Sequence, residues 1–128
     1  SVKLRHLAAW TARRRTLAAH YDARLRAKGF KVIEPHAKAT SVYHLYVVEC
    51  ANRDQTLAHL QAKGIGAGIH YPIPLHLQPA LAARGGKRGQ LPQTEQTVER
   101  IHSLPLSPDL TDDEADQVCD TFLASAKP

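Results

Sequence analysis

The side chains of this 128-residue chain that could do chemistry are concentrated in one short segment, residues 68–76. The segment reads Gly-Ile-His-Tyr-Pro-Ile-Pro-Leu-His, so two imidazoles and a phenol stand beside two prolines. Imidazole and phenol groups can each donate or accept hydrogen bonds, which suits a ligand rich in hydroxyls. Prolines fix the direction of the backbone, and a preorganised loop loses little entropy on binding. The pattern predicts a binding loop whose candidate contacts are His70, Tyr71 and His76.

Two other interpretations of these side chains are open. From the residues alone, the simpler interpretation is that His70 and Tyr71 are structural, with their hydrogen bonds made at the edge of a strand. His70 and His76 could also be metal ligands, because imidazole is a common ligand. No Cys, Asp or Glu lies between Gly64 and Gly89 to complete a set, so no metal site is expected. The two cysteines, Cys50 and Cys119, lack zinc-type spacing and are expected to be buried free thiols.

Helical periodicity predicts four main helices around this loop. Residues 1–28 form the longest, with apolar side chains at spacings of three, four and seven and a stop at Gly29. The others are expected at 53–63, at 93–102, and from a capping box at Thr111–Glu114 onward. A short helix is expected at 78–83, followed by a flexible basic loop at 84–89.

Strand-forming residues predict a short sheet between these helices. β-Branched and aromatic side chains mark residues 42–48, while 30–33 and the glycine-interrupted 65–71 are further candidates. His44 would lie on one face of the strand 42–48 as a hydrogen-bonded structural residue. This order of elements predicts an α/β fold, an α+β sandwich in which helices pack on one face of a short, mostly antiparallel sheet.

The net charge of +5 and the sequence pI near 9.5 raise the question of a polyanionic partner. Much of the excess is arginine in the first helix, but Arg13-Arg14-Arg15 turns by ~100° per residue and forms no flat stripe. We expect it to be solvated or packed against another domain, with phosphate binding second and nucleic acid third. No apolar run approaches the ~20 residues of a membrane span, and we expect a cytoplasmic protein.

Four stretches, taken in order, resemble the C-terminal domain of the DegT/DnrJ-type sugar aminotransferases. The most specific is Gly68-Ile-His-Tyr-Pro-Ile-Pro-Leu-His-Leu-Gln78, preceded by Gly64-Ile65. The other three are Arg13-Arg14-Arg15 with Tyr21, the run Tyr43–Val48, and Ser103–Thr111. Residues 84–90 depart from the aromatic-bearing loop that is more usual in the family. The resemblance spans almost the whole chain.

The resemblance implies a fold type I aminotransferase that acts as a homodimer and contains pyridoxal phosphate bound by a large domain. That enzyme would move an amino group, usually from glutamate, to a keto carbon of a nucleotide-linked sugar. Residues 1–128 would form the single small domain, with 1–28 as an interdomain helix and 29–128 as the α/β body. His70 and Tyr71 match positions that face the sugar, with His76 on the same loop. The motif His-Tyr-Pro-Ile-Pro-Leu-His-Leu-Gln at 70–78 resembles the corresponding segment of family members that act at the sugar C3 position more than that of members that act at C4.

None of the seven lysines lies in anything similar to the family's Schiff-base segment, so no catalytic residue is expected in this chain. The chain contains no methionine and starts within a helical stretch. We therefore expect a fragment that is inactive alone, with the reactive lysine upstream. The alternative is a free-standing α/β ligand-binding or interaction module without catalysis, and a basic nucleic-acid binder is third.

Overall fold

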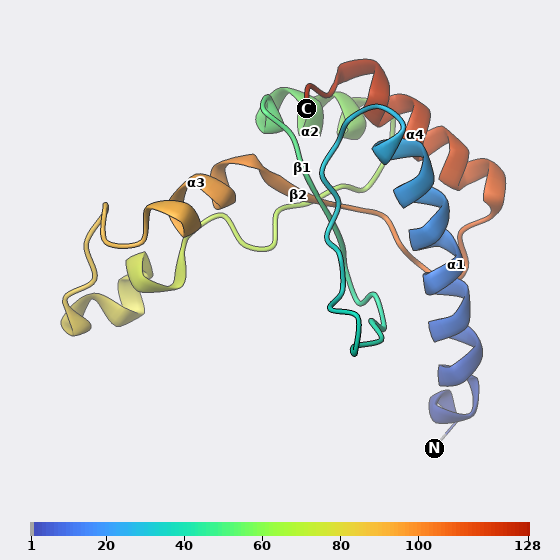
Figure 1. Ribbon diagram of the computed structural model, residues 1–128, viewed down its shortest axis with the longest axis horizontal. Coiled ribbons are helices and arrows are strands. Elements are labelled where there is room, and N and C mark those ends of the chain that lie inside the picture. The colour runs from blue at the N-terminus through green and yellow to red at the C-terminus, as the bar shows by residue number, and fades with distance from the viewer. Residues whose placement is uncertain (1) are drawn as a thin grey trace.

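The computed structural model describes residues 2–128, which alternate helices with two short strands (Figure 1). In chain order the elements are η1 (Lys3–His6), α1 (Leu7–Arg26), β1 (Tyr46–Glu49), α2 (Arg53–Ala62), η2 (Leu75–Leu77), η3 (Pro79–Arg84), α3 (Pro92–Arg100), β2 (Ile101–Leu104) and α4 (Asp112–Ser125). Along this described part of the chain, no helix is long and apolar enough to cross a membrane.

The sheet is short and antiparallel, as predicted. β1 and β2 pair with Tyr46 opposite Leu104 and Glu49 opposite Ile101. Two isolated bridges widen it, one from Val32 to β1 and one from Gly68 to β2. Because the second bridge leads directly into residues 68–76, the sheet positions the candidate loop.

The core lies where α1, α2 and α4 meet the sheet (Figure 1). Tyr21, Leu60 and Phe122 are fully buried there, one from each of these three helices. The Phe122 ring meets Phe30 edge-on, with the two centroids 4.9 Å apart. The Tyr21 hydroxyl donates to the carbonyl of Pro105 at 2.9 Å, so α1 is also tied to the chain beyond β2.

The predicted helix signals are confirmed at several positions. Gly29 has a φ of 81°, a left-handed conformation that favours glycine, and it follows the end of α1. At the start of α4 the Thr111 hydroxyl accepts from the Glu114 amide at 3.2 Å, and the Glu114 carboxylate accepts from the Thr111 amide at 2.8 Å. α2 also lies where expected, at Arg53–Ala62.

The strand predictions were partly wrong. Residues 42–48 form a strand only from Tyr46, because Tyr43 has a φ of 47° and bends the chain. Residues 30–33 and 65–71 contribute single bridges instead of strands. The glycines of the second segment and Pro72 limit its pairing.

The helix predicted at 93–102 was wrong at its end. α3 stops at Arg100, and Ile101 turns into the extended conformation with a φ of −89° and a ψ of 146°. Residues 101–104 pair with β1, a partner about fifty positions earlier in the chain. Such long-range pairing overrides local helical preference.

Residues 72–91 and α3 extend away from the helical core as an arm (Figure 1). The arm consists of η2, η3, a glycine-rich connection and α3. Several apolar side chains near its base and on the arm are exposed, namely Tyr71, Ile73, Leu75 and Leu91. The candidate loop therefore joins the sheet to the arm.

Candidate functional site

The candidate loop, residues 68–76, is fastened to the sheet at Gly68. The Gly68 amide donates to the Ser103 carbonyl at 3.2 Å, and the Gly68 carbonyl accepts from the Ser103 amide at 2.7 Å. A Cβ at Gly68 would lie 3.5 Å from Cε1 of His70, so the imidazole lies against the glycine backbone. The sheet edge thereby sets the position of His70.

Ser103 orients the imidazole of His70. Nδ1 of His70 lies 3.0 Å from the Ser103 hydroxyl, in hydrogen-bonding range. Tyr71 meets the His70 ring edge-on, with centroids 5.7 Å apart and an interplanar angle of 81°, and the peptide bond between them is cis. Tyr71 is 71% exposed. The structure brings these two predicted contacts together, and neither the Tyr71 hydroxyl nor Nε2 of His70 has a hydrogen-bond partner within residues 2–128.

His76, the third predicted contact, lies apart from this pair. Its side chain is only 13% exposed, and Nε2 lies 3.0 Å from a carboxylate oxygen of Glu95 on α3. His70 and His76 line different cavities. His76 therefore braces the arm, and the loop does not present both imidazoles to one space.

Glu95 joins three separate parts of the arm through hydrogen bonds to its carboxylate. Its carboxylate is buried and accepts the Gly89 amide at 2.9 Å and the Leu91 amide at 3.3 Å, besides its contact with His76. The pKa of Glu95 is lowered, chiefly by the Gly89 amide and, against the opposing effect of burial, by His76 and Leu91. The basic loop 84–89 was expected to be flexible, but this carboxylate fixes its end.

A basic cleft of about 330 Å³ lies on one side of His70. Its wall includes Arg14 of α1, His44 before β1, and Ser103 beside His70. His44 is exposed and has no hydrogen bond in the part of the chain that is described, so its predicted structural role was wrong. We call this space the Arg14 cleft.

An apolar cavity of about 470 Å³ also reaches His70. Val32, Val47 and Ile101 contribute its apolar wall, next to the sheet. His70 thus borders an apolar space and a basic one, which is the combination of surfaces that small-molecule sites use.

In the Arg13-Arg14-Arg15 run, expected to be solvated or packed against another domain, Arg15 is exposed, and Arg13 and Arg15 also make contacts within the chain. Arg13 donates to the Leu110 carbonyl and pairs with Asp112 at 2.9 Å, and Arg15 donates to the Ser41 carbonyl at 2.8 Å. Arg14, the residue between them in the sequence, is half-buried and lines the cleft. A closer reading of the helical period would have found it, because Arg14 is three residues before Leu17 and seven before Tyr21, both buried.

The thiols are structural, as predicted. Cys50 and Cys119 are free and fully buried. Burial raises the pKa of Cys119 to about 11 and also raises the pKa of Cys50. A neutral, inaccessible thiol is a poor nucleophile. Within residues 2–128, no group of three or more His, Cys, Asp and Glu side chains could hold a metal ion.

Residues 1–123 match the model of the DegT/DnrJ/EryC1/StrS aminotransferase family. The chain belongs to this family. The family uses pyridoxal phosphate in general, and the fold and the resemblance predicted from the sequence are confirmed by this match.

Curated relatives agree over nearly the whole chain. The erythromycin biosynthesis sensory transduction protein EryC1 of Saccharopolyspora erythraea is 44% identical over 126 residues, which are 98% of this chain and 34% of the relative. The dTDP-3-amino-3,4,6-trideoxy-alpha-D-glucose transaminase of Streptomyces venezuelae is 38% identical over 122 residues, 93% of this chain and 32% of the relative. The chain thus spans about a third of the length of these relatives.

Solved structures show the same arrangement. S. venezuelae DesV, determined in complex with a ketimine intermediate, superposes with a TM-score of 0.88 at 36% identity, covering 94% of this chain and 33% of DesV. A family member from Brucella abortus gives a TM-score of 0.86 at 35% identity, over 95% of this chain and 32% of its own. The fold of the chain is therefore that of one part of a sugar aminotransferase.

Proposed function

We propose that this chain is the small domain of a pyridoxal-phosphate-dependent aminotransferase that transfers an amino group, from glutamate, to a keto carbon of a nucleotide-linked sugar. The observation that carries the proposal is the pair His70 and Tyr71, held at the sheet edge by Ser103 on a proline-braced loop, in a chain of this family. Within residues 2–128, Nε2 of His70 and the Tyr71 hydroxyl have no hydrogen-bond partner, so both can bond to a ligand.

The chemistry of this pair suits a sugar. Nδ1 of His70 is engaged by Ser103, which leaves Nε2 to donate or accept one hydrogen bond. The Tyr71 hydroxyl offers a second polar group on a largely exposed ring. A pyranose presents hydroxyls next to apolar ring faces, so a phenol ring with a hydroxyl matches both parts. We assign binding roles to these residues and no proton transfer.

His76 belongs to the site through the arm. Its link to Glu95 sets where the arm leaves the loop, and thereby how Tyr71 and the prolines face the substrate. This role differs from direct contact and is compatible with an imidazole that is only 13% exposed.

The position of amination proposed is C3. Three relatives bear names that place their chemistry there, namely the S. venezuelae transaminase, a UDP-2-acetamido-2-deoxy-3-oxo-D-glucuronate aminotransferase of Pseudomonas aeruginosa, and a UDP-N-acetyl-3-dehydro-alpha-D-glucosamine 3-aminotransferase of Acidithiobacillus ferrooxidans. The last two are 36% and 33% identical to this chain over 97 and 109 residues.

The residues of this chain do not fit pyridoxal phosphate by themselves. All seven lysines are exposed, whereas a lysine that forms a Schiff base is activated by a desolvating or cationic pocket. We therefore place the cofactor and its lysine on another part of the protein. When bound, the cofactor supplies the electron sink for amino transfer, and this chain supplies part of the substrate's surroundings.

The N-terminal half of α1 suits a position between domains. Leu4 of η1 is 67% exposed and Leu7 is 49% exposed, while Leu17 and Leu25 further along are buried. Exposed apolar side chains in a row mark surfaces that pack against something else. We propose that this end of the helix contacts the cofactor domain, within a homodimer.

The reading frame upstream of the Ser1 codon tests this proposal first. It should encode a domain that contains a Schiff-base lysine, and the protein from the whole frame should show the near-visible absorbance of bound cofactor. Incubated with glutamate and a 3-keto-sugar nucleotide, that protein should release 2-oxoglutarate. A stop codon directly before Ser1 would contradict the proposal and leave a binding module without catalysis.

A further inference from the structure

Arg14 is the member of its arginine triplet that lacks a partner. Within residues 2–128 it makes no hydrogen bond and no ion pair, whereas Arg13 contacts Leu110 and Asp112 and Arg15 donates to the Ser41 carbonyl. Its Nε is fully shielded from solvent and still has no acceptor. A buried donor without a partner has lost its hydration without gaining a hydrogen bond, which destabilises the fold. Such a group in a cavity wall indicates a site that a ligand's acceptor completes.

The surroundings of Arg14 are basic and polar. The Arg14 cleft is lined by His44, His70, Ser103 and Ser107 in addition to the guanidinium, and no Asp or Glu is among the residues that line it. Asp112 of α4 pairs with the neighbouring Arg13 at 2.9 Å. The Ser103 hydroxyl is engaged by His70 and the Ser107 hydroxyl donates to Asp109, so the donors that the cleft offers a ligand are the N–H groups of Arg14 and His44.

The backbone before β1 presents His44 to this cleft. Tyr43, directly before it, has a φ of 47°, a conformation that a side-chain-bearing residue rarely adopts. The Ser41 hydroxyl accepts the Tyr43 amide at 3.0 Å, and Arg15 holds the Ser41 carbonyl. Residues held in strained conformations by their surroundings cluster at ligand sites. The bend thus adds the His44 imidazole to the same cleft wall as Arg14.

We propose that the Arg14 cleft binds an oxyanion, a carboxylate or a phosphate, with Arg14 as its main contact and His44 as a second donor. Arginine suits this role because its planar fork of N–H groups matches both kinds of oxyanion. The cleft is continuous with His70, so a ligand whose neutral part reaches His70 would place its charged part against Arg14. This last step rests on the proposed function, but binding of the anion does not.

Two sources could supply the anion in the proposed reaction, the carboxylates of the amino donor or the phosphates of the nucleotide sugar. The test is an NMR titration of the 15N-labelled 128-residue chain, which follows the Nε–Hε signal of Arg14 and the imidazole signals of His44. The probes are glutamate, 2-oxoglutarate and inorganic pyrophosphate, each against sodium chloride at the same ionic strength. The tighter-binding class of probe identifies the source.

The matched variants are Arg14→Gln and Arg5→Gln. Both remove one charge from the same N-terminal helical stretch, and Arg5 does not line the cleft. Arg14→Gln should weaken binding by about tenfold or more, as expected for loss of a charged hydrogen bond, while Arg5→Gln should leave it within about twofold. Arg14→Lys, which keeps the charge but not the fork, should fall between them.

Saturable shifts at Arg14 and His44 with any of these probes, abolished in Arg14→Gln, would support the subsite. Absence of shifts in the wild-type chain, identical shifts with chloride, or equal weakening in Arg14→Gln and Arg5→Gln would overturn it. The outcome is independent of amino transfer. If anions bind here but His70 proves irrelevant to sugar turnover, the proposed function fails and the subsite stands.

Discussion

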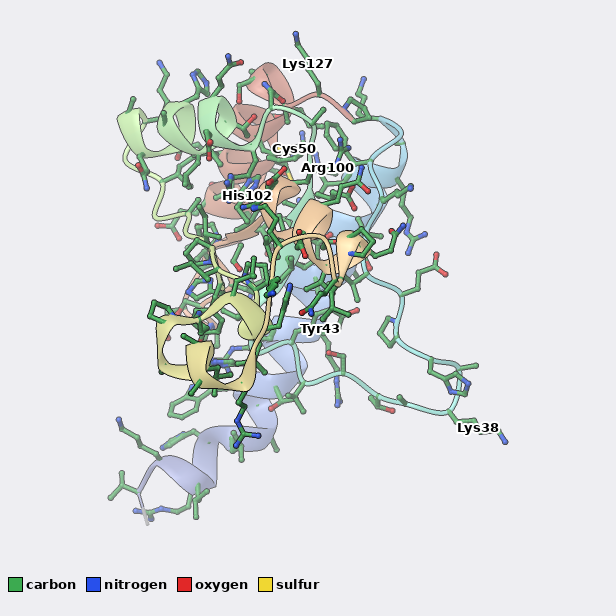
Figure 2. The ribbon with its side chains drawn as sticks, turned by 90° about the vertical axis from the view of Figure 1, so that its left-hand side faces the viewer. Lys38, Tyr43, Cys50, Arg100, His102 and Lys127 are labelled. Atoms are coloured by element: carbon green, nitrogen blue, oxygen red, sulfur yellow. The ribbon has the colours of Figure 1, made fainter. Side chains whose placement is uncertain are left out.

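His102 should make this fold sensitive to mild acid. The imidazole lies in β2 with no exposed surface, beside Cys50 (Figure 2). Its Nδ1 is 4.0 Å from the Cys50 sulfur, its Nε2 has no hydrogen-bond partner among residues 2–128, and its ring packs against Phe122 with centroids 5.6 Å apart. Burial, and then the nearby charge of Arg53, lower the pKa of His102 from 6.5 to about 4.

The sign and size of the effect follow from proton linkage. Well above pH 6.5 the imidazole is neutral in both the native and the unfolded chain, so there it adds no pH dependence. Between pH 6.5 and about 4 the unfolded chain takes up a proton that the native chain refuses, so the free energy of unfolding falls as the pH is lowered. At about 1.4 kcal/mol per unit of pKa, the full loss is about 3 kcal/mol, of which about 2 kcal/mol is lost between pH 7 and pH 5.

The assay is urea unfolding of the wild-type chain and of His102→Leu at pH 7 and pH 5. Leucine fills a similar volume and does not titrate, so the other histidines contribute equally to both proteins. The stability of the wild type relative to His102→Leu should fall by about 2 kcal/mol on acidification. An unchanged difference between the two proteins would refute the reasoning, because it would mean that His102 is protonated in the native state.

Three further changes test the arm, the candidate loop and the last helix. Gly86→Ala should destabilise the arm by about 1–3 kcal/mol, as expected for overpacking, because a Cβ there would lie 2.0 Å from the His76 carbonyl oxygen. Gly66→Ala should be tolerated, because a Cβ there would meet no atom of residues 2–128 within 4 Å, and equal melting temperatures for the two variants would contradict the packing. Glu95→Gln should speed amide hydrogen exchange at residues 87–91 without changing exchange in α1, because the amide side chain is uncharged and keeps only one of the two oxygens that accept from Gly89 and Leu91. Thr111→Ala removes the capping box and should cost about 1 kcal/mol in urea unfolding, and a loss below a few tenths would show that the cap is not needed.

Local patterns in the sequence predicted the helices well. The capping box at Thr111–Glu114, the glycine stop at Gly29 and the apolar spacing of α1 each act within a few residues. Strand boundaries failed where they depend on distant partners. Ile101 and His102 were predicted as the end of a helix, because the strand that pairs with them, Tyr46–Glu49, lies more than fifty residues earlier.

The candidate site was predictable only in part, because some of its contacts also join residues that are far apart in the sequence. His70 and Tyr71 stood out as adjacent polar rings beside prolines, and the structure keeps them together. The Ser103 hydroxyl that orients His70 is 33 residues away, so no local pattern indicates it. The separation of His76 also depends on a distant partner, the buried carboxylate of Glu95.

The central claim is that His70 faces the sugar of a nucleotide-sugar substrate. The most direct measurement is the KM for a 3-keto-sugar nucleotide, and kcat with it, in the protein from the whole reading frame carrying His70→Ala. His36→Ala is the control. His36 is exposed and lies two residues before Lys38, which Figure 2 shows at the outermost part of a loop that extends away from the rest of the chain. We predict a rise in KM of about tenfold, as for loss of one or two hydrogen bonds, with unchanged cofactor absorbance and a normal KM for glutamate. Equal KM values for His70→Ala, His36→Ala and the wild type would contradict the claim.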